Sequence, residues 1–243
     1  DFADAGGLGI TLDGTNNFGT LTFNSTGAVS ITESSATTLA GASTAATLDL
    51  NSGGALTDAA LATLTVTGNA DLADAGGAGI TLDGTANFGT LTFNSTGAVA
   101  LTEGSATILA GANTAAALDL NAGGSLTDAA LASLTVAGNA DLADAGGAGI
   151  TLDGTSNFGT LTFNSTGTVA ITEASATELT GVSTAGALDL NSGGELIDAA
   201  LASLTVTGNA DFADAGGAGI ALDGTNNFGT LTFNSTGAVA ITE

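Results

Sequence analysis

The feature that most constrains this chain is a near-identical internal repeat. The heptapeptide DFADAGG at residues 1–7 returns with small changes at Asp71, Asp141 and Asp211, a period of 70 residues. The chain holds three full units and part of a fourth: residues 1–70, 71–140, 141–210 and 211–243. Units of this size bury their apolar side chains by stacking on one another. We therefore expect one continuous solenoid over residues 1–243, and, because neither end carries a capping sequence, a fragment of a longer chain.

Within each unit, short stretches alternate apolar and polar residues. In TLTF at residues 20–23, Leu21 and Phe23 point to one face and the threonines to the other, which is the period of a β-strand. Residues 28–32 alternate in the same way, and the segments between them are rich in Gly, Asn and Asp, which favour turns. β-Branched residues and frequent glycine disfavour helix, so only residues 56–62 suit a helical turn. We predict an all-β chain with Leu and Phe in the core.

Related strand patterns follow further along the unit, TLDL at residues 47–50 and TLTV at residues 63–66. Their spacing of 27, 27 and 16 residues around the cycle suggests three rungs, with Leu21, Leu48 and Leu64 at equivalent places. Turns of about 23 residues remain an alternative, since 16 residues are few for a three-sided coil. The predicted fold is a parallel, right-handed β-helix or β-solenoid built from 70-residue units of about three rungs each.

The charge of the chain excludes several classes of partner. No Lys, Arg or His offsets the 24 Asp and Glu residues, which gives a formal net charge of −24. Binding of nucleic acid requires cationic side chains, so we expect no nucleic-acid partner, and anionic membranes are disfavoured for the same reason. Apolar residues still make up 44% of the chain, which argues against disorder. No apolar run approaches the ~20 residues of a membrane-spanning helix, so we expect no transmembrane segment.

Two stretches carry a resemblance to a known group of proteins. They are residues 19–24 with residues 27–29, and residues 47–51 with residues 54–56. Both resemble the G-x-L-x-Φ-x-x-x-G-x-Φ rung of large bacterial surface proteins of the filamentous-haemagglutinin and autotransporter-passenger type, and the resemblance extends over the whole chain. It implies right-handed parallel β-helices, export across the outer membrane, an extracellular or bacterial cell-surface location, and roles as fibres, adhesins, biofilm components or envelope layers.

The acidic residues offer one candidate metal site. Asp1, Asp4 and Asp13 recur in every unit, and we take them as calcium candidates because Ca²⁺ binds carboxylate and carbonyl oxygens. The stretch departs from a calcium β-roll, since Ile10 and Thr11 stand where that motif requires Asp. The alternative is that these carboxylates lie at solvated corners, with equivalent groups about 14 Å apart, beyond the screening length of about 8 Å. We expect no other cofactor.

Catalysis finds little support in this composition. Without His, Lys, Arg, Cys or Tyr, carboxylates are the only acid–base groups, and each of them returns in nearly unchanged surroundings. A catalytic pair would occur once, so we expect that the chain is not an enzyme. Outward threonines such as Thr20 and Thr22 invite an ice-binding hypothesis, and Asn24 begins a glycosylation sequon in every unit. Strand propensity explains the outward threonines better than ice binding does, and turn geometry alone explains the asparagine.

The sequence therefore predicts a structural extracellular repeat protein that forms a rigid fibre, a stalk, or an element of a surface layer or filament. Uncapped strand edges favour self-association into filaments or layers. The alternative is an adhesin that binds a glycan or protein partner through its lateral face. Binding would then depend on residues that differ between units, such as Glu178, Glu195 and Ile197.

Overall fold

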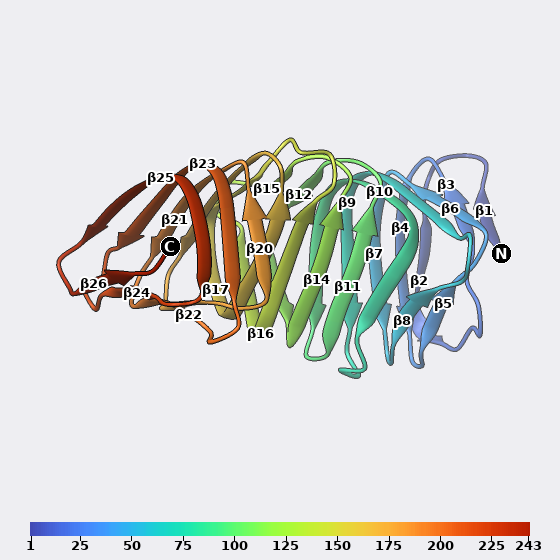
Figure 1. Cartoon of the computed structure of the whole chain (residues 1–243). Helices are drawn as coiled ribbons and strands as arrows, with labels where there is room; N and C mark the ends of the chain where they lie inside the picture. Colours follow the sequence, from blue (N-terminus) through green and yellow to red (C-terminus); the bar gives the residue numbers. More distant parts are fainter.

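The computed structural model describes all residues, 1–243, as a single rod-like coil of β-strands (Figure 1). Its 26 strands form one sheet, in which the pairings between successive coils are parallel. The coil makes about 11 turns, and none of its segments forms a helix that could span a membrane. The prediction of an all-β, parallel β-solenoid is confirmed.

The first unit and its boundary contain β1 (Phe2–Asp4), β2 (Ile10–Asn16), β3 (Phe23–Ser25), β4 (Ala28–Glu33), β5 (Thr37–Leu39), β6 (Ala42–Ala45), β7 (Thr47–Ser52), β8 (Leu56–Asp58) and β9 (Thr63–Asp74). The second unit continues with β10 (Ile80–Ser95), β11 (Ala98–Glu103), β12 (Thr107–Leu109), β13 (Ala112–Ala115), β14 (Ala117–Ala122), β15 (Leu126–Asp128) and β16 (Ser133–Asp144).

The third unit contains β17 (Ile150–Ser165), β18 (Thr168–Glu173), β19 (Thr177–Leu179), β20 (Val182–Ala185), β21 (Ala187–Ser192), β22 (Leu196–Asp198) and β23 (Ser203–Asp214). The partial fourth unit adds β24 (Ile220–Leu222), β25 (Thr225–Ser235) and β26 (Val239–Ile241).

One uninterrupted core fills the coil. Buried and exposed residues alternate along the strands, as in β11, and the inward side chains form a single cluster of 50 buried residues. Leu21 and Phe23 are both buried, as their alternation predicted. Phe18 is partly buried, and its ring centroid lies 5.2 Å from that of Phe2. The aromatic residues therefore serve packing, and the core is continuous from one unit to the next.

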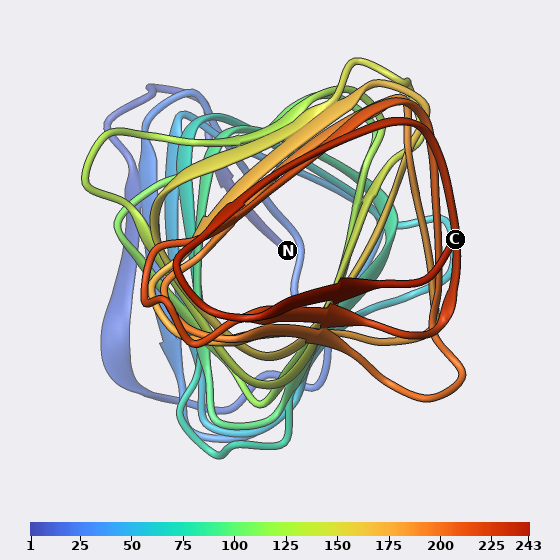
Figure 2. The same ribbon diagram turned by 60° about the vertical axis from the view of Figure 1, so that its left-hand side comes forward.

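The 70-residue unit does not contain a whole number of turns. Seven coil-to-coil steps run along one column: Leu56, Ile80, Val99, Leu118, Ala140, Leu161, Leu179 and Asp198. The column ends two residues past Leu196, which is the counterpart of Leu56 two units later. Two units thus make about seven turns, and each unit is rotated by about half a turn relative to its neighbour. Figure 2 shows the coil closer to its axis, as a stack of three-sided turns.

The predicted rung boundaries are wrong, although the count of about three rungs per unit is right. Leu21 pairs with Leu39, Leu48 pairs with Val29 and Ala70, and Leu64 pairs with Ser43 and Ala86. The three leucines therefore do not stack on one another. The reason is that their shared pattern reflects the alternation of any strand, and one three-sided coil contains several strands.

Residues 56–62, the one stretch that suits a helical turn, form no helix. Residues 56–58 form strand β8, and the chain then makes a tight turn in which the N–H of Ala62 donates to the carbonyl of Ala59. Although leucine is expected in the core, the side chain of Leu61 is 95% exposed. The turn places this residue at its tip, beyond the reach of the core.

Candidate functional site

One acidic position of each unit anchors a corner of the coil. Asp74 accepts hydrogen bonds from the backbone N–H groups of Gly76 and Gly79 and from the hydroxyl of Ser95 on the next coil. Its side chain is buried. Gly77 and Gly79 have φ of 70° and 107°, a region that favours glycine. The DAGG stretch is therefore a turn closed by its own carboxylate.

The other units repeat this anchor at Asp4, Asp144 and Asp214. Hydrogen bonds from the N–H of Gly9 and the hydroxyl of Ser25 hold the pKa of Asp4 below its ordinary value of 3.8. Asp144 and Asp214 are buried, which corrects the expectation that carboxylates of this class lie at solvated corners. The expectation failed because the turn supplies N–H donors that compensate a buried carboxylate.

The position of Asp1 belongs to the outer face, where its counterparts meet a second acidic residue. Asp71 pairs in register with Asp49 of the preceding coil, and Asp141 pairs with Asp119. Adjacent strands lie about 4.8 Å apart, well inside the screening length of about 8 Å. Burial and the neighbouring charge of Asp49 raise the pKa of Asp71, and Asp119 acts on Asp141 in the same way. The expected separation of about 14 Å applied to equivalent carboxylates of successive units, and it did not take into account non-equivalent carboxylates on adjacent coils.

The position of Asp13 forms a second kind of acidic pair. The backbone N–H groups of Asp83, its counterpart, and of Gly84 donate to the carboxylate of Asp58. Burial raises the pKa of Asp58, these N–H groups oppose the rise, and the charge of Asp83 adds to it. Asp128 is held in the same way by the following coil.

The structure does not gather the calcium candidates into a site. Asp4 is engaged by its own turn, while Asp1 and Asp13 are exposed on strand and loop surfaces. Nowhere in the chain do three or more acidic side chains lie close enough together to hold a metal ion. Calcium binding stays a prediction, and the acidic pairs bring together only two carboxylates.

A further class of carboxylate lies inside the coil. Glu103 is 2% exposed; its Oε1 accepts the N–H of Phe88 and the hydroxyl of Ser105, and its Oε2 accepts the hydroxyl of Thr107. Burial raises the pKa of Glu103 above its ordinary value of 4.5, against the effect of these hydrogen bonds. Glu173 has the same partners and the same shift one unit later.

Sequence reasoning missed this class, since a recurring glutamate beside turn residues looks solvated. The available signal is the pattern Glu-x-Ser-x-Thr, present at residues 33–37, 103–107 and 173–177. At Glu103 and Glu173 the two hydroxyls supply donors that a buried carboxylate requires. In the first unit Ser35 and Thr37 donate to other residues, and Glu33 accepts only the N–H of Phe18.

A ladder of amide and hydroxyl side chains runs along the outside of each unit. Successive coils carry Asn94, Thr114 and Thr135 of the second unit and then Asn157 of the third. The hydroxyl of Thr114 donates to Oδ1 of Asn94 at 3.1 Å. The stack places two threonines between two asparagines. The hydroxyl of Thr22 instead donates to the carbonyl of Ala40, so the long, regular threonine array that ice binding requires does not form along TLTF.

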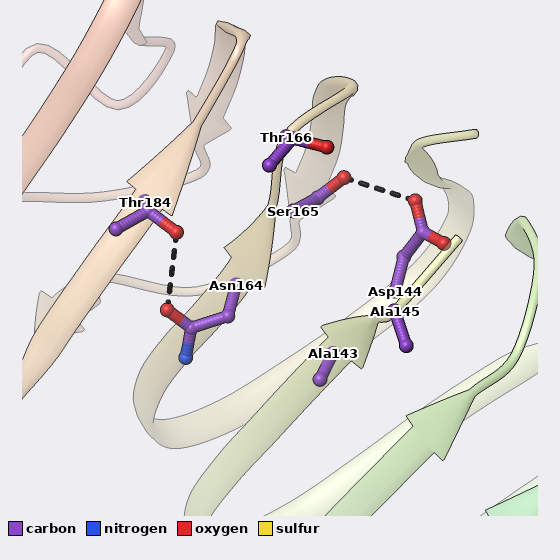
Figure 3. A pocket seen from close by; sticks show the side chains of 7 residues that line it. All are labelled: Ala143, Asp144, Ala145, Asn164, Ser165, Thr166 and Thr184. Carbon is purple, nitrogen blue, oxygen red and sulfur yellow. Dashed lines mark hydrogen bonds between the residues drawn. The ribbon is translucent and has the colours of Figure 1, made fainter. Parts of the chain in front are cut away.

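A shallow hollow opens where this ladder meets the aspartate anchor (Figure 3). It has a volume of about 290 Å³, and its lining consists of Ala143, Asp144, Ala145, Asn164, Ser165, Thr166 and Thr184. The hydroxyl of Ser165 donates to Asp144, and the hydroxyl of Thr184 donates to Asn164, so four of the polar side chains are already paired with one another (Figure 3). A hollow of about 270 Å³ recurs one unit earlier around Asp74. Open, aromatic-free hollows of this kind differ from the deep apolar pockets that hold small ligands.

The residues that distinguish the third unit come together on its surface. Glu178 and Ile197 pair in register on adjacent coils, β19 and β22. In the first unit the corresponding residues are Thr38 and Thr57, whose hydroxyls lie 3.1 Å apart. Two substitutions that lie 19 residues apart in the sequence are therefore neighbours on the surface of the third unit.

The fold and these corner contacts define a tandem-repeat β-solenoid in which acidic side chains close the turns. A family model of repeats of unknown function (DUF5649) matches the chain three times, at residues 26–96, 96–164 and 166–235. The chain belongs to this family. No curated protein and no solved structure matches it. The resemblance to filamentous-haemagglutinin and autotransporter-passenger proteins stays a prediction.

Proposed function

We propose that the chain is a rigid structural rod of an extracellular or bacterial cell-surface protein, acting as a fibre, stalk or layer element. The observation that carries the proposal is the uninterrupted core, whose 50 buried residues extend through all units without a break. Every unit adds length through the same contacts, and nothing interrupts the stack with a specialised domain. Repeat arrays of this kind gain stiffness from the interfaces between neighbouring coils.

The carboxylates favour a role without catalysis. The aspartate anchors return in each unit with the same kinds of hydrogen-bond donor, and so do Glu103 and Glu173, and these donors occupy the lone pairs that acid–base chemistry would use. Their recurrence fits a mechanical role, in which each one closes a turn. The absence of Lys and Arg also removes every trypsin-type cleavage point, which suits a protein outside the cell.

Excision of one unit tests the rod. Removal of residues 71–140 joins two equivalent positions, so the shortened chain should fold and lose about three and a half turns, or about 17 Å of length. Small-angle X-ray scattering measures this length. Removal of residues 141–210 is the matched control and should shorten the particle equally. An unchanged maximum dimension, or a shortened chain that fails to fold, would contradict the rod.

The adhesin remains a second candidate function, favoured by the surface that Glu178 and Ile197 form together. If this surface binds a glycan or protein, the double variant Glu178→Thr and Ile197→Thr, which restores the residues of the first unit, should lose binding on a glycan or protein array. The matched control is Thr102→Asn, an exposed strand position. Equal array signals for both variants would leave the spacer as the better proposal.

A further inference from the structure

Each unit carries one leucine at the tip of a projecting turn. Leu61, Leu131 and Leu201 are 95%, 99% and 95% exposed. In each case the following alanine is buried and its N–H closes the turn onto the alanine two residues before the leucine. Leu8 is exposed to the same degree, at 96%, but alanine stands at its position in the other units, so only these three leucine tips recur from one complete unit to the next.

The backbone conformation makes leucine an unfavourable choice at two of the three tips. Leu61 and Leu131 have φ of 66° and 69°, and they are the only residues other than glycine with positive φ. The chain uses glycine at its other positive-φ positions, where that residue avoids the clash of a side chain. At Leu61 and Leu131 the leucine therefore suits neither the backbone conformation nor the core, and at all three tips the side chain is free to contact another molecule.

The half-turn between units places the leucine tips on two opposite edges of the rod. Leu61 and Leu201 lie seven turns apart on one edge, and Leu131 lies between them on the other. In Figure 2 the cyan turn near residue 60 and the orange turn near residue 200 project to the right, and the yellow-green turn near residue 130 projects to the left. Along each edge the tips recur about every 34 Å.

We propose that the leucine tips bind a second copy of this chain, edge to edge, so that parallel rods associate into a flat layer. Burial of one leucine does not offset the loss of freedom on association, so a stable complex needs several tips engaged at once. A second copy presents tips at the same spacing by construction, whereas a partner without this period would engage one tip. Two opposite edges allow growth in one plane.

Charge sets the condition for this association. The chain carries a formal net charge of −24 with no cationic side chain, and Asp58 and Asp198 lie close in sequence to their tips. Two copies repel each other at low ionic strength, and added salt screens this repulsion. Association should therefore increase with salt, opposite to the behaviour of a complex held by opposite charges.

Sedimentation velocity of the 243-residue chain tests the proposal, at 0.01 M and 1 M NaCl over a wide range of protein concentration. We expect the mass of the particles to rise with concentration in 1 M salt only. The triple variant Leu61→Asn, Leu131→Asn and Leu201→Asn should bind itself at least tenfold more weakly. Asparagine tolerates positive φ, so this variant keeps the fold, which circular dichroism verifies. The matched control Thr32→Asn, Thr102→Asn and Thr172→Asn, at exposed strand positions, should behave as the unchanged chain.

The proposal is overturned if the unchanged chain stays monomeric in 1 M salt at every concentration, or if the leucine variant associates as strongly as the control. The inference takes the proposed rod as given, and the same experiment separates the two. The frictional ratio of the monomeric leucine variant reports whether the particle is elongated, and the mass reports whether the rods associate.

Discussion

The carboxylates at the inner corners and those on the outer face have the same chemistry in opposite settings. Glu103 and Asp144 are buried, and each accepts three hydrogen bonds from N–H and hydroxyl donors. Asp49 and Asp71 lie on the outer face beside each other with no cation to balance them. The corner carboxylates therefore stabilise the coil by accepting hydrogen bonds, whereas the outer carboxylates repel one another, and solvent and salt weaken this repulsion. In a chain without Lys or Arg, hydrogen bonds take the place of ion pairs.

The largest effect should follow from removing an inner carboxylate. Glu103→Ala leaves the N–H of Phe88 and the hydroxyls of Ser105 and Thr107 without their acceptor in a buried place, and it opens a cavity. We expect a loss of about 3–5 kcal/mol in the free energy of unfolding, measured by denaturant titration. Glu103→Gln keeps one acceptor oxygen and should lose about half as much. A loss below about 1 kcal/mol for Glu103→Ala would show that the corner donors find water instead.

The aspartate anchor should have the next largest effect. Asp144→Ala removes the acceptor of the N–H groups of Gly146 and Gly149, at a turn that is partly accessible to water. We expect a loss of about 2–3 kcal/mol, and a smaller loss for Asp144→Asn, which keeps one oxygen. Thermal unfolding compares both variants with Thr172→Asn, an exposed control. Equal stability of all three variants would mean that the glycine turn closes without its carboxylate.

These two kinds of site differ in how far the sequence reveals them. The alternation of Leu21 and Phe23 identifies inward residues because strand geometry is local, and the repeat identifies the solenoid. The stacking of Asp71 on Asp49 is non-local. It depends on the number of residues in each corner between strands, and this number varies from one coil to the next. The burial of Glu103 depends in the same way on where Phe88 lies one coil earlier. Local patterns therefore predicted the fold class, whereas coil-to-coil register determined the carboxylate environments.

The dependence of stability on pH should reflect both the carboxylates with raised pKa values and those with lowered pKa values. Folding raises the pKa values of four carboxylates, Glu103, Glu173, Asp71 and Asp141. Their protonation therefore stabilises the fold. This contribution is complete below the ordinary pKa values, 4.5 for Glu and 3.8 for Asp, and is lost as pH rises through the pKa values of the folded chain. The pKa values of Asp4 and Asp214 are lowered, so their contribution is lost as pH falls below 3.8. We expect stability to rise from pH 7 to about pH 4 and to fall below it.

Thermal unfolding of the dilute chain across this range checks the pH prediction. Glu103→Gln has no titrating group at that corner, so it should show a smaller rise between pH 7 and pH 4 than the unchanged chain. A stability that falls steadily from pH 7 downward would mean that the lowered carboxylates dominate, and it would contradict the assigned directions.

The smallest effect should come from the outer pair. Asp49→Asn removes one of two like charges that lie about 4.8 Å apart across adjacent coils, so the variant should be more stable by about 0.5 kcal/mol at low ionic strength. The gain should vanish in 1 M NaCl, where the screening length falls to about 3 Å. The matched control is Glu195→Gln, which removes the charge of an exposed glutamate that belongs to neither kind of acidic pair. A gain that persists in high salt would mean that Asp49 destabilises the coil through desolvation instead of repulsion, and the contrast between inner and outer carboxylates would then rest on burial alone.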